Sequence, residues 1–528
     1  MENRNGMGTA EERGVLRFQL PICDRTLTNE VSEEVSLPDY QPEIKRLLRV
    51  SATVQPANRY VGGGAVEFSG TVDYCILYAG NDGQMYCFPT TSDYSFRVPL
   101  EAETAFDLND GLVAYVESEP ESVITRVGGP RRMSVKCRLR SRVCVYGSFV
   151  AEEKRRDGES AAREERLLRE SEGAVCAYGI SEPQTVQDEI LLEHEDGAPD
   201  AWRIISGEAQ VQINEVMCGN GRVNCRGDVV VKLLMQKEAT LEEAAALPTT
   251  VLRKLPFSGE IPMDGAAING EAVATGSCTR LDLTLEEGRV LCDAEIVLEA
   301  RSQRQDRVPY TADWYAQGHE SDCTMVEYAL PSAVRCVNGN LTQSEARPLE
   351  EVGIPASARP VDTAGSATVE GVEIAKNRVV VTGKCRYSMI LADGGDMSAK
   401  EVDMPFRYTA DGVFHTDGPL SYEAQAQVMT ARARMDGERL AVDAELTIAL
   451  RLWEVRPVQM VGEVHVGEEV RVPSGQVRLR YPAADETLWD VAKQYHVSTA
   501  SLMEKNHLDG AGRADDGKSL TGVSVLVL

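Results

Sequence analysis

Phosphate binding is the first chemistry that a short segment of the sequence suggests. Residues 512–519 match the pattern Gly-x-x-x-x-Gly-Lys-Ser, which holds phosphate groups when a strand precedes the loop and a helix follows it. The residues after Ser519 alternate like a strand and not like a helix. Asp515 and Asp516 would also repel phosphate from within the loop. We therefore interpret this segment as a polar turn before a strand.

Other residues that could catalyse a reaction or bind a metal are too scattered to form a recognisable site. There is no Gly-x-Ser-x-Gly elbow and no Cys-x-x-Cys pair. The thirteen cysteines are spread along strand-like runs, as reduced and buried thiols would be. The histidines lack the spacing of a metal-binding pair; they are His194, His319, His415, His465, His496 and His507. The sequence predicts a protein that is not an enzyme and holds neither cofactor nor metal.

Binding of another macromolecule is what the C-terminal region suggests instead. Residues at i, i+3, i+4 and i+7 predict one apolar face of a short helix, at Leu488, Val491, Ala492 and Tyr495. Asp485 or Thr487 can cap the start of this helix, and Ser498 can cap a second one. Strand-like segments flank the two helices. Residues 477–528 are therefore predicted to form a small β-α-α-β unit.

This unit resembles a LysM domain in the order of its motif residues, which are Tyr481, Asp485, Thr487-Leu488, Val491-Ala492, Tyr495, Val497-Ser498, Leu502, Asn506 and Leu508. It departs from the usual pattern where Asp485-Glu486 replaces Gly-Asp. The resemblance implies a shallow groove for N-acetylglucosamine polymers, walled by the loops before the first helix and after the second. The groove residues by this match are Asp485, Glu486, Thr487, Leu488, Leu508, Asp509 and Gly510.

Trp489 is the residue of this unit most suited to binding a protein partner. It follows Leu488, which begins the buried face, so it should point about 100° away and be at least partly exposed. An exposed tryptophan is a favoured interface anchor because it buries a large, rigid area. The alternative is that Trp489 packs against the third β domain, at 320–470. The predicted docking surface consists of Trp489, Glu486, Lys493 and Lys505.

A strand pattern centred on a glycine occurs three times in the rest of the chain. Gly70, Gly227 and Gly383 are 157 and 156 positions apart, and apolar residues alternate on both sides of each. A glycine within a strand predicts a bulge or a close backbone approach. A hairpin turn precedes each strand, and a second turn and strand follow it. Downstream of each glycine lies a phenylalanine, at Phe96, Phe257 and Phe406.

The chain is therefore predicted to be mainly β, with three tandem antiparallel β-sandwich-like repeats and then the small β-α-α-β LysM-like domain. The charge-dense stretch 151–172 has helical spacing and is predicted to be a linker helix between the first two repeats. The repeats are expected at 15–150, 173–316 and 320–470, and the LysM-like domain at 477–528.

The three repeats, most clearly the first, resemble the DUF3794, or SPOCS, family of clostridial sporulation proteins, and the resemblance covers nearly the whole chain. The resemblance rests on Leu37-Pro38-Asp39, Pro42-Glu-Ile44 and Val66-x-Phe-x-Gly70-x-Val-x-Tyr-x-Ile-Leu-Tyr78. It implies a scaffold or adaptor of spore coat and envelope assembly, working in the mother-cell cytoplasm at the forespore surface. Its LysM tail would dock on the ATPase of the coat basement layer, of the SpoIVA type. The alternative is a carbohydrate-binding protein that recognises peptidoglycan or a spore polysaccharide through LysM.

Charge and hydropathy limit the partners further. The net charge of −28 disfavours nonspecific binding to nucleic acid, which needs clustered cations, and disfavours anionic membrane surfaces for the same reason. The polar stretch Met1–Phe18 lacks the apolar run of a signal peptide, and no window is apolar enough to cross a bilayer. We expect a cytoplasmic protein that is not inserted in a membrane.

Overall fold

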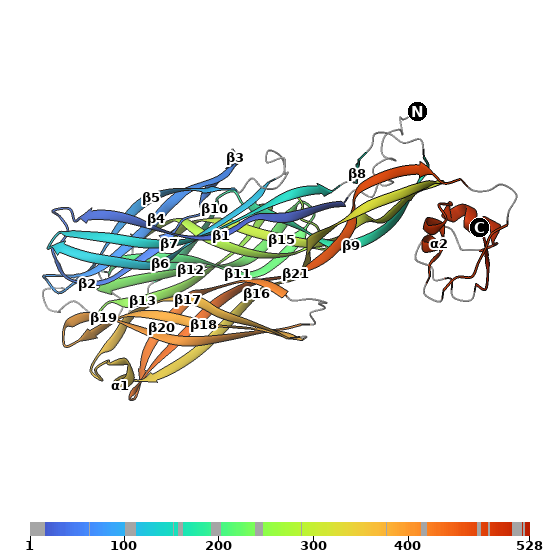
Figure 1. Ribbon diagram of the computed structural model, residues 1–528. Coiled ribbons are helices and arrows are strands. Elements are labelled where there is room, and N and C mark those ends of the chain that lie inside the picture. The colour runs from blue at the N-terminus through green and yellow to red at the C-terminus, as the bar shows by residue number, and fades with distance from the viewer. Residues whose placement is uncertain are drawn as a thin grey trace, which may run out of the picture.

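The computed structural model shows a chain built almost entirely from antiparallel β-strands, so the predicted mainly-β fold is confirmed (Figure 1). It describes residues 16–528 apart from 63, 101–111, 152, 157–161, 192–201, 238–246, 287, 376, 413–419, 472–476, 484–485, 509–519 and 521–522. The helices in this part of the chain are four or seven residues long, and none could span a membrane.

Repeat 1 consists of two antiparallel sheets. One has the order β1-β7-β6, with bounds Leu16–Ser36, Arg132–Ala151 and Val113–Gly129. In the other, a central strand pairs with β5 on one edge and with β2 and then β3 on the opposite edge. The bounds of the central β4, of β5, of β2 and of β3 are Ala65–Gly80, Met85–Pro99, Ile44–Val54 and Asn58–Gly62.

Repeats 2 and 3 have the same pair of sheets with the same strand order. In repeat 2, one sheet has the order β11-β12-β13, with bounds Trp202–Gly219, Arg222–Lys237 and Thr249–Pro262. The other has the order β10-β15-β14, with bounds Gln184–Leu191, Arg289–Ala316 and Glu271–Glu286. Strand β9 (Glu164–Ile180) also pairs with β15. In repeat 3 they are β17-β18-β19 (Arg359–Ala375, Arg378–Asp393, Asp396–Asp411) and β16-β21-β20 (His319–Pro348, Arg439–Glu469, Leu420–Asp436). The short helix α1 (Leu349–Val352) connects the two sheets of repeat 3.

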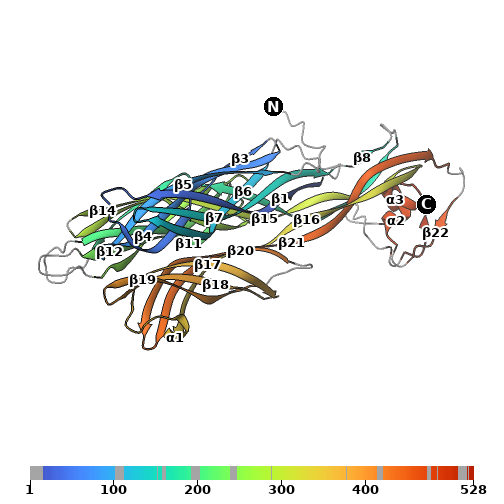
Figure 2. The same cartoon turned by 60° about the vertical axis from the view of Figure 1, so that its left-hand side comes forward.

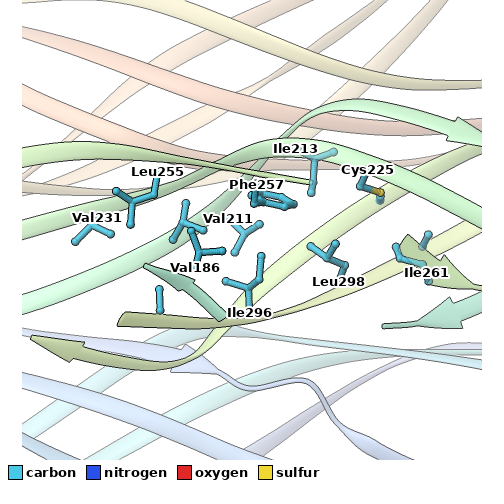
Figure 3. Packing of buried hydrophobic residues seen from close by; sticks show 14 of the residues in the cluster. Val186, Val211, Ile213, Cys225, Val231, Leu255, Phe257, Ile261, Ile296 and Leu298 are labelled. Atoms are coloured by element: carbon cyan, nitrogen blue, oxygen red, sulfur yellow. The ribbon is translucent and has the colours of Figure 1, made fainter. Parts of the chain in front are cut away.

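Each repeat buries its core between its two sheets, and Figure 3 shows this for repeat 2. Alternate residues of the strands point inward, which places one apolar face of each sheet against the other. The core side chains that come from the two sheets include Val211, Ile213, Cys225, Val231, Leu255, Phe257, Val186, Ile296 and Leu298. The antiparallel sandwich therefore follows from the alternation that the sequence displays.

The glycine at the centre of each repeat lies opposite a break in the neighbouring strand. The register shifts by one residue between Ile213 and Glu215 opposite Gly227, and again between Val369 and Gly371 opposite Gly383. A Cβ atom on Gly227 would lie 1.9 Å from the carbonyl oxygen of Gln212. The prediction of a bulge or close backbone approach at this position is confirmed.

Replacing Gly227 by alanine should lower the free energy of unfolding by about 1–3 kcal/mol, because the new methyl group would meet backbone that cannot move aside cheaply. Gly129→Ala is the matched control, since a Cβ atom there has open space around it. Chemical denaturation of both variants is the measurement. Equal midpoints for the two variants would contradict this account of the glycine.

An aromatic ring on the next strand covers each of these glycines. Phe257 and Phe406 are the cross-strand partners of Gly227 and Gly383, as the spacing of the repeats suggests. In repeat 1 the partner of Gly70 is Tyr94, two residues before the phenylalanine that marks this position in the sequence pattern. The ring covers backbone that a glycine leaves uncovered and so stabilises the strand pair.

The linker helix predicted at 151–172 is wrong for the residues described there. Lys154–Arg155 form β8, which pairs in parallel with β21, and 164–172 belong to β9. Along 164–180, β9 forms a continuous antiparallel ladder with β15. The spacing of charged residues favours a helix only weakly. The long strand β15 offers hydrogen-bond partners to the backbone of β9 along its length, and these outweigh the local helix propensity.

Strands β9, β15, β16 and β21 run on beyond the sandwiches and lead to the C-terminal domain (Figures 1 and 2). We call this extension the stalk. The C-terminal domain itself has the predicted order β-α-α-β, with β22 (Leu479–Arg480), α2 (Leu488–Gln494), α3 (Thr499–Lys505) and β23 (Leu526–Val527). It lies at the far end of the stalk from the main body of the repeats (Figure 2).

A buried carboxylate, that of Glu423, contacts side chains of all three repeats. Glu423 on β20 is 6% exposed and contacts Arg142 of repeat 1 at 2.6 Å, Arg301 of repeat 2, and its neighbour Arg451 at 3.4 Å. Burial alone would raise the pKa of Glu423, but the arginines hold it down to about 2. The arrangement therefore joins the repeats by charge as well as by apolar packing.

Candidate docking interface in the C-terminal domain

Side-chain caps determine where the two helices of the C-terminal domain begin. The hydroxyl of Thr487 accepts from the backbone N–H of Asp490, whose carboxylate accepts in return from the N–H of Thr487. Ser498 likewise caps α3 by accepting from the N–H of Ser501. Thr487 and Ser498 are thus confirmed as caps. The helices bury Leu488, Val491, Ala492 and Leu502 against Leu520 and Leu526.

The prediction that Trp489 is exposed is wrong. Its side chain is 2% exposed, and its indole N–H donates to Oδ2 of Asp313 on β15 at 2.8 Å. The indole also packs edge-to-face on Tyr315, with ring centroids 4.9 Å apart. The face of α2 that carries Trp489 is therefore covered by the stalk, beside the face that packs in the core of the C-terminal domain. Trp489 does pack against a β domain, as the alternative states, but its partner β15 belongs to repeat 2 and not to the domain at 320–470.

Lys493 lies in the same internal contact. Its ammonium group is 2.5 Å from Oδ1 of Asp313, so one carboxylate holds both predicted docking residues. The Tyr315 hydroxyl donates to the carbonyl of Val497 at 2.8 Å, and the N–H of Gly318 donates to the carbonyl of His496 at 2.8 Å. A bulge between Thr311 and Asp313 precedes these contacts on β15. The C-terminal domain is therefore anchored to the stalk.

The other two predicted docking residues have different surroundings. Glu486 accepts from the backbone N–H of Ala483 and from Arg480, both at 2.9 Å, and these bonds lower its pKa. This carboxylate shapes the loop before α2 and is already hydrogen-bonded within the domain. Lys505 is exposed in the last turn of α3. Binding of a partner by Lys505 stays a prediction.

The predicted glycan groove is only partly described. Leu488 is in the core, Thr487 is the helix cap, and Leu508 packs partly buried against the same core. Asp485, Asp509 and Gly510 lie outside the described residues, as does the loop pattern at 512–519. Among the groove residues that can be placed, the side chains serve the internal structure of the domain.

A row of exposed apolar side chains lies on and beside β22 and was missed by the sequence analysis. Val477, Leu479 and Tyr481 are 77%, 55% and 71% exposed and occupy alternate positions of this segment, of which Leu479 lies in β22. We call these residues the β22 row. In the part of the chain that the structure describes, β22 pairs with β23 alone. The alternation is visible in the sequence, but it does not show which face is covered.

Grouped metal ligands, hollows and buried carboxylates are the features of the described residues of the repeats that bear on catalysis. Within the described ranges, no three His, Cys, Asp or Glu residues are grouped closely enough to hold a metal ion. An open depression of about 440 Å³ lies over Gly70 and has Asp93 as its one carboxylate. The buried carboxylates Asp362 and Glu423 are each paired with basic side chains.

No protein-family model matches this chain, and the searches of curated proteins and of solved structures found no match either.

Proposed function

We propose that the chain is a non-enzymatic scaffold or adaptor that holds its C-terminal domain out on a stalk for a protein partner. The observation that supports this most is the anchoring of α2 through Trp489, Lys493 and Asp313. This contact positions the domain at one end of the molecule while the β22 row stays exposed. Three repeats that pack through charged and apolar contacts supply the rigid body.

The β22 row is suited to binding an extended segment of another protein. An open strand edge can pair with an added strand through main-chain hydrogen bonds, and alternate side chains then select the partner. Residues 477–528 carry six Lys or Arg and seven Asp or Glu, a net charge of −1, so the other −27 lies on the rest of the chain. An acidic partner would therefore meet little repulsion at this domain.

The resemblance to sporulation proteins gives the proposal its setting. By that resemblance, the partner is the ATPase of the coat basement layer, and the adaptor acts at the forespore surface in the mother cell. The sandwich body would then supply contacts to further coat proteins. Recognition of a glycan through the LysM-like groove is the competing function.

Replacing Leu479 by glutamate in the full-length chain should reduce recovery of the ATPase from sporulating cells at least about ten-fold, which is ~1.4 kcal/mol of binding free energy. In the complex, the carboxylate introduced at position 479 would be buried at the centre of the β22 row without a positively charged partner. The control is Leu191→Glu, because Leu191 is 76% exposed at the end of β10, far along the chain from this domain.

Equal recovery by the two variants would remove the β22 row from the proposal. Sedimentation of the purified full-length chain with cell-wall material, without other proteins, tests the competing function. Co-sedimentation that Leu479→Glu leaves unchanged would favour glycan binding.

A further inference from the structure

Two cysteines face each other across the β4–β5 hairpin. Cys75 on β4 is opposite Pro89, and Cys87 on β5 is opposite Leu77, so the two form a diagonal pair on one face of the sheet. Their Sγ atoms are 2.8 Å apart, and both side chains are partly exposed. A disulfide bond of about 2.05 Å would require the two sulfur atoms to approach by roughly 0.8 Å.

The pair packs against the place where all three repeats meet. We call this the central seam; it consists of Leu48, Leu77, Ala79, Met85, Ile205, Leu234, Ile390 and Met397. Cys75 and Cys87 both contact it. A bond between them would therefore tie together the two strands by which repeat 1 contributes most to the seam.

A buried arginine carries positive charge close to Cys75. Arg49 lies on β2, diagonal to Cys75, and is 7% exposed. Its Nη2 contacts Asp362 of repeat 3, which also binds Lys232 of repeat 2 at 2.7 Å. Nε and Nη1 of Arg49 have no hydrogen-bond partner. These N–H groups carry positive charge near the sulfur atom of Cys75, which must become a thiolate before it can react.

We propose that Cys75 and Cys87 are a reversible dithiol–disulfide pair that locks the β4–β5 hairpin at the central seam. This goes beyond the adaptor function, because it assigns a modification site to the body of the protein. The oxidant is a low-molecular-weight disulfide, and Cys75 and Cys87 each keep part of their side chain exposed to it.

The reaction proceeds by two exchange steps. One cysteine loses its proton, and its thiolate attacks the small disulfide, which breaks that S–S bond and releases one small thiolate. The other cysteine then loses its proton and displaces the second small thiolate, which forms the Cys75–Cys87 bond. The protein gives up two electrons and two protons, and the small disulfide becomes two thiols.

The rate of this reaction should rise with pH. Sharing of a hydrogen bond with Cys87 and burial both raise the pKa of Cys75 well above its usual value. The thiolate is therefore scarce at neutral pH and becomes more abundant as pH increases.

Incubation of the reduced full-length chain with oxidised glutathione, followed by alkylation and trypsin digestion, tests the proposal. Residues 60–97 contain both cysteines and no internal Lys or Arg, so trypsin releases them as one peptide. We expect this peptide to be lighter by two hydrogen atoms and unalkylated, and to take up two alkyl groups after reduction. The oxidised chain should also melt at a higher temperature than the reduced chain.

Two variants make the result decisive. Cys75→Ser should lose both the lighter peptide and the rise in melting temperature, whereas Cys278→Ser, a change at a partly exposed cysteine on β14, should keep both. A peptide that remains doubly alkylated, or that stops at a glutathione adduct, would overturn the proposed bond. A disulfide that leaves the melting temperature unchanged would overturn the proposed lock.

Discussion

Replacing Glu423 by glutamine is expected to lower the free energy of unfolding by about 3–5 kcal/mol. This carboxylate balances Arg142, Arg301 and Arg451, which come from three different repeats. Glutamine keeps the volume but not the charge, so Arg301 and Arg451 would lose this carboxylate while buried, and Arg142 would keep only its contact with Asp24. Denaturant unfolding of the full-length chain is the measurement.

Glu445→Gln is the matched control for this substitution. Glu445 pairs with Lys254 at 2.6 Å, but both side chains are more than a third exposed. Solvent screens such a pair, and its loss should change the unfolding free energy by no more than about 1 kcal/mol. Similar losses for both variants would show that Glu423 does not hold the repeats together.

The same carboxylate should make the stability of the body sensitive to acid. The pKa of Glu423 is held at about 2 in the folded chain, below its usual value of 4.5. Its contribution is therefore complete above pH 4.5 and is lost as pH falls from 4.5 through about 2. Glu423→Gln should lack this part of the acid dependence. Glu117, whose pKa burial raises to about 7 with a smaller contribution from the charge of Glu423, affects stability at higher pH and is distinguished in that way.

Replacing Trp489 by alanine is expected to release the C-terminal domain from the stalk. Loss of a buried indole costs about 3–5 kcal/mol, and here it removes both the contact with Tyr315 and a hydrogen bond to Asp313. Backbone amides of α2 and α3 should then exchange with solvent far faster, while those of the three repeats keep their protection. Hydrogen exchange followed by mass spectrometry separates the two regions.

Two further changes distinguish anchoring from partner binding at this position. Trp489→Phe keeps a ring against Tyr315 but loses the N–H donor, so its exchange should be intermediate. Tyr481→Ala removes an aromatic that is 71% exposed and should leave the exchange of α2 unchanged. If Trp489→Ala preserved the protection of α2, the anchoring role would be wrong.

Features that depend on neighbours in the chain could be read from the sequence. The helix that begins at Thr487, the apolar face that starts at Leu488, and the alternating strands of the repeats all follow from spacing alone. The glycine at position 227 also predicted a bulge or close backbone approach, and a side chain there would meet the backbone of Gln212. In each case the cause lies within a few residues or in one hairpin.

Features that depend on what packs from elsewhere could not be read in this way. The direction in which Trp489 points is set by α2, but its burial is decided by Asp313 and Tyr315, which lie more than 170 positions earlier. Residues 164–172 of the predicted linker helix form a strand because β15 supplies a ladder for them. Periodicity states which side chains share a face, whereas only the tertiary structure decides what covers that face and which charges meet there.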